Sequence, residues 1–94
     1  MVIGLLTMQI HMKGINSLKE KRCIVKSLIG RLKSRFNVSV SEVDSQDSRS
    51  RAGIGIALVS NDSRFVHQQL DAIISFSRAD SRFTLGCIER ELFS

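Results

Sequence analysis

The sequence predicts a ferredoxin-like α+β sandwich, in which two helices cover one face of a four-stranded antiparallel sheet. The first observation behind this prediction is the order of the periodic segments, strand–helix–strand–strand–helix–strand, because two strand–helix–strand units joined by a central hairpin are typical of that fold. The second is size and composition. A chain of 94 residues, with 43% apolar residues, 24% charged residues and no proline, suits one compact globular domain over residues 1–94.

The first strand and the first helix have the clearest patterns. Residues 2–12 alternate between large apolar side chains and a second set that becomes polar towards its end, which indicates a strand. A helix is expected from Ser17 to about Phe36, because Ser17 and Glu20 have the spacing of a capping box. At 100° per residue, the large apolar side chains of this segment fall within an arc about 100° wide; they are Leu18, Val25, Leu28, Ile29, Leu32 and Phe36.

The second half of the chain repeats this pattern with weaker signals. Strands are indicated by alternating apolar residues, and the turns and caps between them by serine, asparagine and aspartate. The expected elements are strands over 37–43, 52–59 and 82–92, a polar hairpin loop over 44–51, and a helix from the cap residues 60–62 to about Ala79.

One face of the expected sheet has no helix over it. Strand alternation places Ile3, Leu5, Ala57 and Val59 on this open face. Because a partly apolar surface left uncovered in one chain favours self-association, we expect a homodimer.

The net charge of +5 is unevenly distributed along the chain. Residues 1–41 contain eight Lys or Arg and one acid, a balance of +7, whereas residues 42–94 contain six Lys or Arg and eight acids, a balance of −2. This asymmetry indicates an acidic partner for the N-terminal half, and nucleic acid is the commonest such partner.

The first helix places basic residues where a helix does not favour them. Lys19, Lys21 and Arg22 lie in its first turn and a half, although cations at a helix N-terminus are disfavoured by about 0.3–1 kcal/mol each. Glu20 is the only acid on this helix. A solvated basic face is the ordinary explanation for such a pattern. We favour anion binding here, because a purely structural helix usually mixes charges of both signs.

The direction of these side chains gives the expected surface. Lys19, Arg22, Lys26 and Lys33 share a stripe about 60° wide and about 21 Å long, which suits successive phosphates of a nucleic acid backbone. Lys21 points into the apolar arc, so its ammonium is expected to extend outwards near the helix start. There it would join the free backbone N–H groups, which attract anions.

The two central strands argue against base stacking. RNA-recognition domains of the same element order stack bases on aromatic residues of these strands, and here "VIGLLTMQIHM" and "AGIGIALV" contain none. We therefore expect binding through phosphate contacts, with weak sequence preference and strong salt dependence.

Signals for enzyme chemistry are weak. His67 and Asp71 have the spacing of a surface ion pair, and the G-x-G at 53–55 lacks the third glycine of a phosphate loop. Cys23 and Cys87 are isolated and are expected to be small buried residues. We expect no enzyme activity, no metal and no cofactor. An acylphosphatase-like activity is the enzyme alternative, on fold analogy alone.

Several stretches together resemble the YlxP-like family of small bacterial proteins of unknown biochemical function. They are "MVIGLLT", "SLKEKR" followed by "KSLI", "RFNVSVSEVD" and "VSND", and the resemblance is close over residues 1–62. It implies a ferredoxin-like fold, dimers, and genes beside those of translation factors; some members have a ribosome-binding-factor label. The chain departs from the family at "DSRSRA", 47–52, where bulky apolar or aromatic residues are replaced by Ser and Arg. Arg49 and Arg51 can instead extend the basic surface.

These observations lead to one hypothesis and one rival. We expect a cytoplasmic homodimer without a membrane segment, because the apolar first dozen residues are too short to cross a bilayer and lack the flanks of a signal peptide. Its expected partner is RNA, with the ribosome as one candidate. The rival is a protein-interaction module whose protein partner binds the same helix or the open sheet face. The expected RNA-contacting residues are Lys19, Lys21, Arg22, Lys26, Lys33, Arg49 and Arg51.

Overall fold

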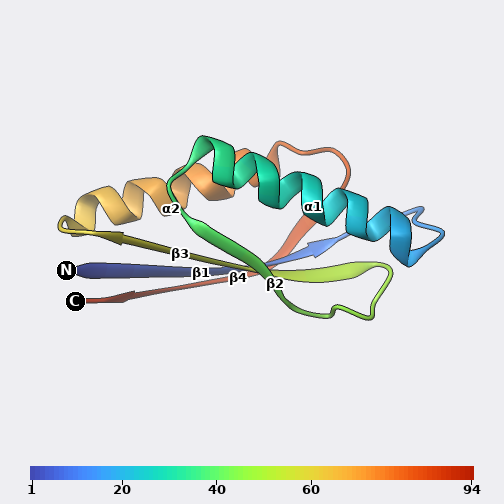
Figure 1. The fold of residues 1–94 in the computed structure, drawn as a ribbon, viewed down its shortest axis with the longest axis horizontal. Helices are drawn as coiled ribbons and strands as arrows, with labels where there is room; N and C mark the ends of the chain where they lie inside the picture. The colour runs from blue at the N-terminus through green and yellow to red at the C-terminus, as the bar shows by residue number, and fades with distance from the viewer.

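The computed structural model describes residues 1–94 and confirms the predicted fold class (Figure 1). Its four strands form one antiparallel sheet in the order β2-β3-β1-β4, and both helices lie on the same face of that sheet. The elements are β1 (Val2–His11), α1 (Leu18–Arg35), β2 (Ser39–Asp44), β3 (Arg51–Ser60), α2 (Ser63–Arg78) and β4 (Thr84–Phe93).

The core lies between the sheet and the two helices. Leu6, Met8 and Ile10 of β1 alternate inwards and are buried beneath the helices, while the residues between them face the open side of the sheet. β1 pairs with β3 from Val2 to His11 without interruption, whereas its register with β4 shifts between Met8 and Ile10. This shift is a β-bulge, in which two residues of β4, Gly86 and Cys87, lie opposite the single residue Gln9 of β1.

The start of α1 has the predicted capping interactions. The Ser17 side chain accepts a hydrogen bond from the backbone N–H of Glu20 at 3.2 Å. The Glu20 carboxylate in turn accepts one from the backbone N–H of Asn16 at 3.3 Å, one residue earlier than in the standard box. α1 lies over β2, and the β2–β3 hairpin extends beneath its first turns (Figure 1). α2 lies over β1 and β3.

Two expectations about individual side chains are wrong. Cys23 and Cys87 are exposed, because Cys23 lies on the outward side of α1 and Cys87 lies at the β4 bulge. Asp71 does not pair with His67: its carboxylate accepts a hydrogen bond from the guanidinium of Arg90 at 2.8 Å. The exposure of Cys23 follows from helical spacing alone, whereas Cys87 and Asp71 depend on β4, which local spacing does not describe. No helix of the structure is both long enough and apolar enough to cross a membrane.

Candidate functional site

Four of the expected cations form an open row along α1. The side chains of Lys19, Arg22, Lys26 and Lys33 are all exposed, and none has a carboxylate oxygen within 4.0 Å. We call these four residues the basic stripe. Their charges are therefore not neutralised within the chain, and an external anion meets no competing carboxylate on them.

Lys21 does not belong to this surface, and its expected position is wrong. Its side chain is 1% exposed, and its Nζ lies 3.0 Å from Oε2 of Glu42 on β2. The same Nζ donates hydrogen bonds to the carbonyl oxygens of Ser45, at 2.6 Å, and Gln46, at 3.3 Å. Glu42 Oε2 is buried and accepts no well-aligned hydrogen bond, so its contact with Lys21 is electrostatic. Lys21 thus fastens α1 to the β2–β3 hairpin.

The two arginines of the hairpin lie in different places. Arg49 is exposed, and its guanidinium donates to the carbonyl oxygen of Asn16 at 3.5 Å, so it reaches the start of α1. Arg51 pairs in register with His11, and the next residue, Ala52, is buried beneath the helices. Strand alternation therefore directs Arg51 to the open face of the sheet. The structure joins Arg49, and not Arg51, to the region of the basic stripe.

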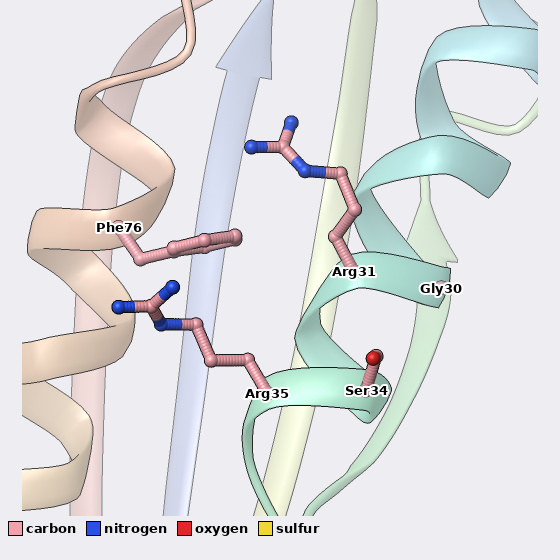
Figure 2. A pocket seen from close by; sticks show the side chains of 5 residues that line it. All are labelled: Gly30, Arg31, Ser34, Arg35 and Phe76. Carbon is pink, nitrogen blue, oxygen red and sulfur yellow. The ribbon is translucent and has the colours of Figure 1, made fainter.

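A second group of cations on α1 was missed by the sequence analysis. The guanidinium carbons of Arg31 and Arg35 lie 4.9 and 5.2 Å from the ring centroid of Phe76 on α2. Figure 2 shows the ring between the two guanidinium groups, with Gly30 and Ser34 on the adjoining side of α1. These five residues line a shallow depression of about 510 Å³, which we call the interhelical groove. A helical plot of α1 alone does not show that Phe76 lies opposite these arginines.

Arg31 is held from its other side by Asp80, which follows α2. The Asp80 carboxylate accepts hydrogen bonds from Arg31 at 3.0 Å and from Arg82 at 2.6 Å. The hydrogen bond from Arg82 is the largest reason that the pKa of Asp80 falls to about 2. The carboxylate therefore stays ionised at any physiological pH, and it keeps Arg31 beside the groove.

The open face of the sheet has an apolar end. Ile3 pairs in register with Val59 on one side and with Phe93 on the other, and Leu5 lies opposite Ala57 in the next row. Val59 is 61% exposed and Phe93 is 49% exposed. We call Ile3, Leu5, Ala57, Val59 and Phe93 the apolar patch. It confirms the expected position of the four residues that alternation placed on this face.

Comparisons with known proteins give a family match and a relative in sequence. Residues 3–90 match the family described as "Protein of unknown function (DUF503)". The "Uncharacterized protein YlxP" of Bacillus subtilis (strain 168) is 35% identical over 75 residues, which cover 80% of this chain and 82% of that protein.

Two solved structures have a similar course of the chain. One is SnoaB, a cofactor-independent oxygenase from Streptomyces nogalater, with 12% identity and a TM-score of 0.49 over 99% of this chain and 91% of that one. The other is a dimeric ferredoxin-like protein from an uncultured marine organism, with 13% identity and a TM-score of 0.44 over 97% and 92% of the two chains. Neither likeness carries an argument about what this chain does.

Proposed function

This chain belongs to the DUF503 family of proteins of unknown function, and we propose that it binds RNA through the basic stripe of α1. The observation that supports the proposal is the row of four exposed cations without carboxylate partners. From Lys19 to Lys33 the row extends about 21 Å along the helix, at 1.5 Å per residue. A row of this length can contact several phosphates of one strand.

The position of the stripe within α1 strengthens the proposal. Lys19 and Arg22 lie in the first turn and a half of the helix, where cations oppose the helix dipole. Glu20 is engaged in the cap with Asn16, so it neutralises neither of them. These two cations lower the stability of the helix, and no carboxylate of the chain offsets that loss. A bound polyanion would offset it.

The absence of aromatic residues on β1 and β3 favours contacts through phosphates over contacts through bases. Neither strand offers a ring on which a base can stack, so the proposed contacts are between side-chain cations and phosphates. Such contacts position an RNA strand without reading its sequence.

Salt dependence tests this proposal directly. For four phosphate contacts to a single strand, log K is expected to fall with log[salt] at a slope of about −3. Fluorescence anisotropy of a labelled 20-nucleotide RNA at several salt concentrations measures that slope, and an uncharged peptide nucleic acid of the same sequence is the control. A slope near zero, or no binding at low salt, would contradict the proposal. Cosedimentation with ribosomal subunits under the same conditions tests the ribosome as the source of the RNA.

We also propose that the apolar patch joins two copies of the chain. If a two-fold axis runs parallel to β1 above the open face, the apolar patch of one copy contacts the apolar patch of the other. The same axis would also bring Glu89 and Glu91 of β4, which share the open face, opposite the hydroxyls of Ser39 and Ser41 on β2. Like charges would then not meet across the interface. This arrangement favours a second copy over an unrelated protein as the occupant of the patch.

Replacing Val59 with lysine is expected to give a monomer. The side chain is 61% exposed, so the substitution leaves the fold of one chain intact but places a charge in the apolar patch. Light scattering after size exclusion measures the mass of wild type and variant, and Ser75→Lys on the exposed side of α2 is the matched control. A wild-type protein that is monomeric at about 100 μM, in the range of weak associations, would refute the dimer.

A further inference from the structure

The interhelical groove is built around one aromatic ring. Arg31 and Arg35 cover opposite faces of the Phe76 ring, at 4.9 and 5.2 Å from the centroid (Figure 2). The edge of the same ring meets Phe36, with centroids 5.9 Å apart and an interplanar angle of 81°. The ring therefore separates the two guanidinium groups. Both groups lie beside the ring without a ligand present.

The groove has more positive charge than the chain neutralises. Asp80 is the one carboxylate in contact with this region, and it is shared between Arg31 and Arg82. Arg35 has no carboxylate oxygen within 4.0 Å. A phenyl ring attracts each cation only weakly at an exposed site, by about 0.5–1 kcal/mol. Arg35 thus remains available to an anion, and the only carboxylate that competes for Arg31 is the one that Asp80 shares with Arg82.

The α1 side of the groove is bare. A Cβ atom on Gly30 would meet no atom within 4 Å, so no packing within the chain requires glycine there. Glycine in the interior of a helix lowers helix stability relative to alanine. Ser34, one turn later, adds a hydroxyl group on the same side of α1 as Gly30. The missing side chain leaves the adjoining side of α1 open to a ligand.

We propose that the interhelical groove is a phosphate-binding site, with the guanidinium groups of Arg31 and Arg35 and the hydroxyl of Ser34 as hydrogen-bond donors. One guanidinium group can donate two hydrogen bonds to a phosphate. Because Arg31 and Arg35 lie on the two sides of the ring, a ligand with two linked phosphate groups can contact one arginine with each. The phosphate belongs either to an RNA strand, in which case this site extends the contact proposed for the basic stripe and rests on it, or to a free phosphorylated molecule.

Titration with inorganic pyrophosphate tests the site, followed by two-dimensional NMR of the backbone amides. We expect saturable shifts at Gly30, Arg31 and Ser34 in the wild-type protein, and their loss in Arg35→Gln. The matched control is Arg78→Gln, which removes the same charge from α2, about 160° around that helix from Phe76 and away from the basic stripe. Arg78→Gln is expected to leave the pyrophosphate shifts unchanged. Shifts that are absent, or that are the same in Arg35→Gln as in wild type, would overturn the site.

The same variants separate the two sources of phosphate. If the phosphate belongs to RNA, pyrophosphate competes with labelled RNA, and Arg35→Gln weakens RNA binding about threefold to tenfold. If it belongs to a free molecule, pyrophosphate binds the groove without displacing RNA. A wild-type protein that binds pyrophosphate in the groove but no RNA supports this site and refutes the proposed function, so the two failures are distinguishable.

A variant that adds bulk without changing charge completes the test. Gly30→Leu places a side chain into open space, so it is expected to raise the melting temperature while blocking pyrophosphate. Unchanged pyrophosphate shifts in a folded Gly30→Leu protein would count against a ligand in the groove.

Discussion

Replacing both Lys19 and Lys26 with glutamate is expected to abolish RNA retention while leaving the domain at least as stable as the wild type. Lys19 is the second residue of α1, so a glutamate there interacts favourably with the helix dipole, by about 0.3–1 kcal/mol. A glutamate at position 26 lies four residues after Arg22 and adds an ion pair of about 0.2–0.5 kcal/mol. Loss of binding in this variant cannot then be attributed to unfolding.

The expected loss of affinity is about 100-fold or more. Each substitution removes one phosphate contact and adds a carboxylate that repels the neighbouring phosphate, so the stripe changes from four cations to two cations and two anions. The slope of log K against log[salt] is also expected to become shallower, by the amount that about two phosphate contacts contribute. Anisotropy measures affinity and slope, and thermal melting followed by circular dichroism measures stability.

The control variant makes the same change in net charge on a different helix. Arg64 and Arg78 are exposed on α2 and have no carboxylate partner. They lie 200–240° around the helix from Phe76, by about 100° per residue, and so face away from α1. Arg64→Glu with Arg78→Glu is expected to weaken RNA binding only slightly. Equal losses in the two double variants would mean that net charge, and not the stripe, governs binding.

The sheet could be predicted from sequence because its pattern is local and simple. The two-residue alternation of β1 assigns Leu6, Met8 and Ile10 to the core, and the structure places them there. The capping box of α1 is equally local, since Ser17 and Glu20 contact each other across one turn. Patterns of this kind involve neighbours in the sequence, so they do not depend on how the helices meet the sheet.

The errors concern side chains whose partners are distant in the sequence. A helical plot correctly directs Lys21 towards the core. It does not show that carbonyl groups of the β2–β3 hairpin lie there and accept hydrogen bonds from its ammonium group. In the same way, Arg31 and Arg35 lie outside both the apolar arc and the basic stripe, and only the position of Phe76 on α2 brings them together. Both cases need the packing of elements far apart in the chain.

Replacing Lys21 with methionine is expected to cause the largest loss of stability among single substitutions of basic residues. Methionine fills a similar volume, but it leaves Glu42 with a buried carboxylate oxygen and no cation. It also removes the donor to the carbonyl of Ser45, which has a positive φ of 61° and needs its neighbours to hold that conformation. Breaking a fully buried ion pair costs about 3–5 kcal/mol, and since Glu42 is 18% exposed we expect about 2–4 kcal/mol.

A second substitution in the Lys21 variant identifies the cause of that loss. Lys21→Met combined with Glu42→Gln is expected to recover part of the free energy of unfolding, because the uncompensated charge is gone while the Ser45 carbonyl still lacks its donor. Urea denaturation measures both variants, with Lys19→Met as the exposed control. The double variant is also expected to bind RNA with the wild-type salt slope, since the Lys21 charge is neutralised inside the chain, whereas Lys19→Met reduces the slope by about one contact. A Lys21→Met protein as stable as Lys19→Met would show that the ion pair does not fasten α1 to the hairpin.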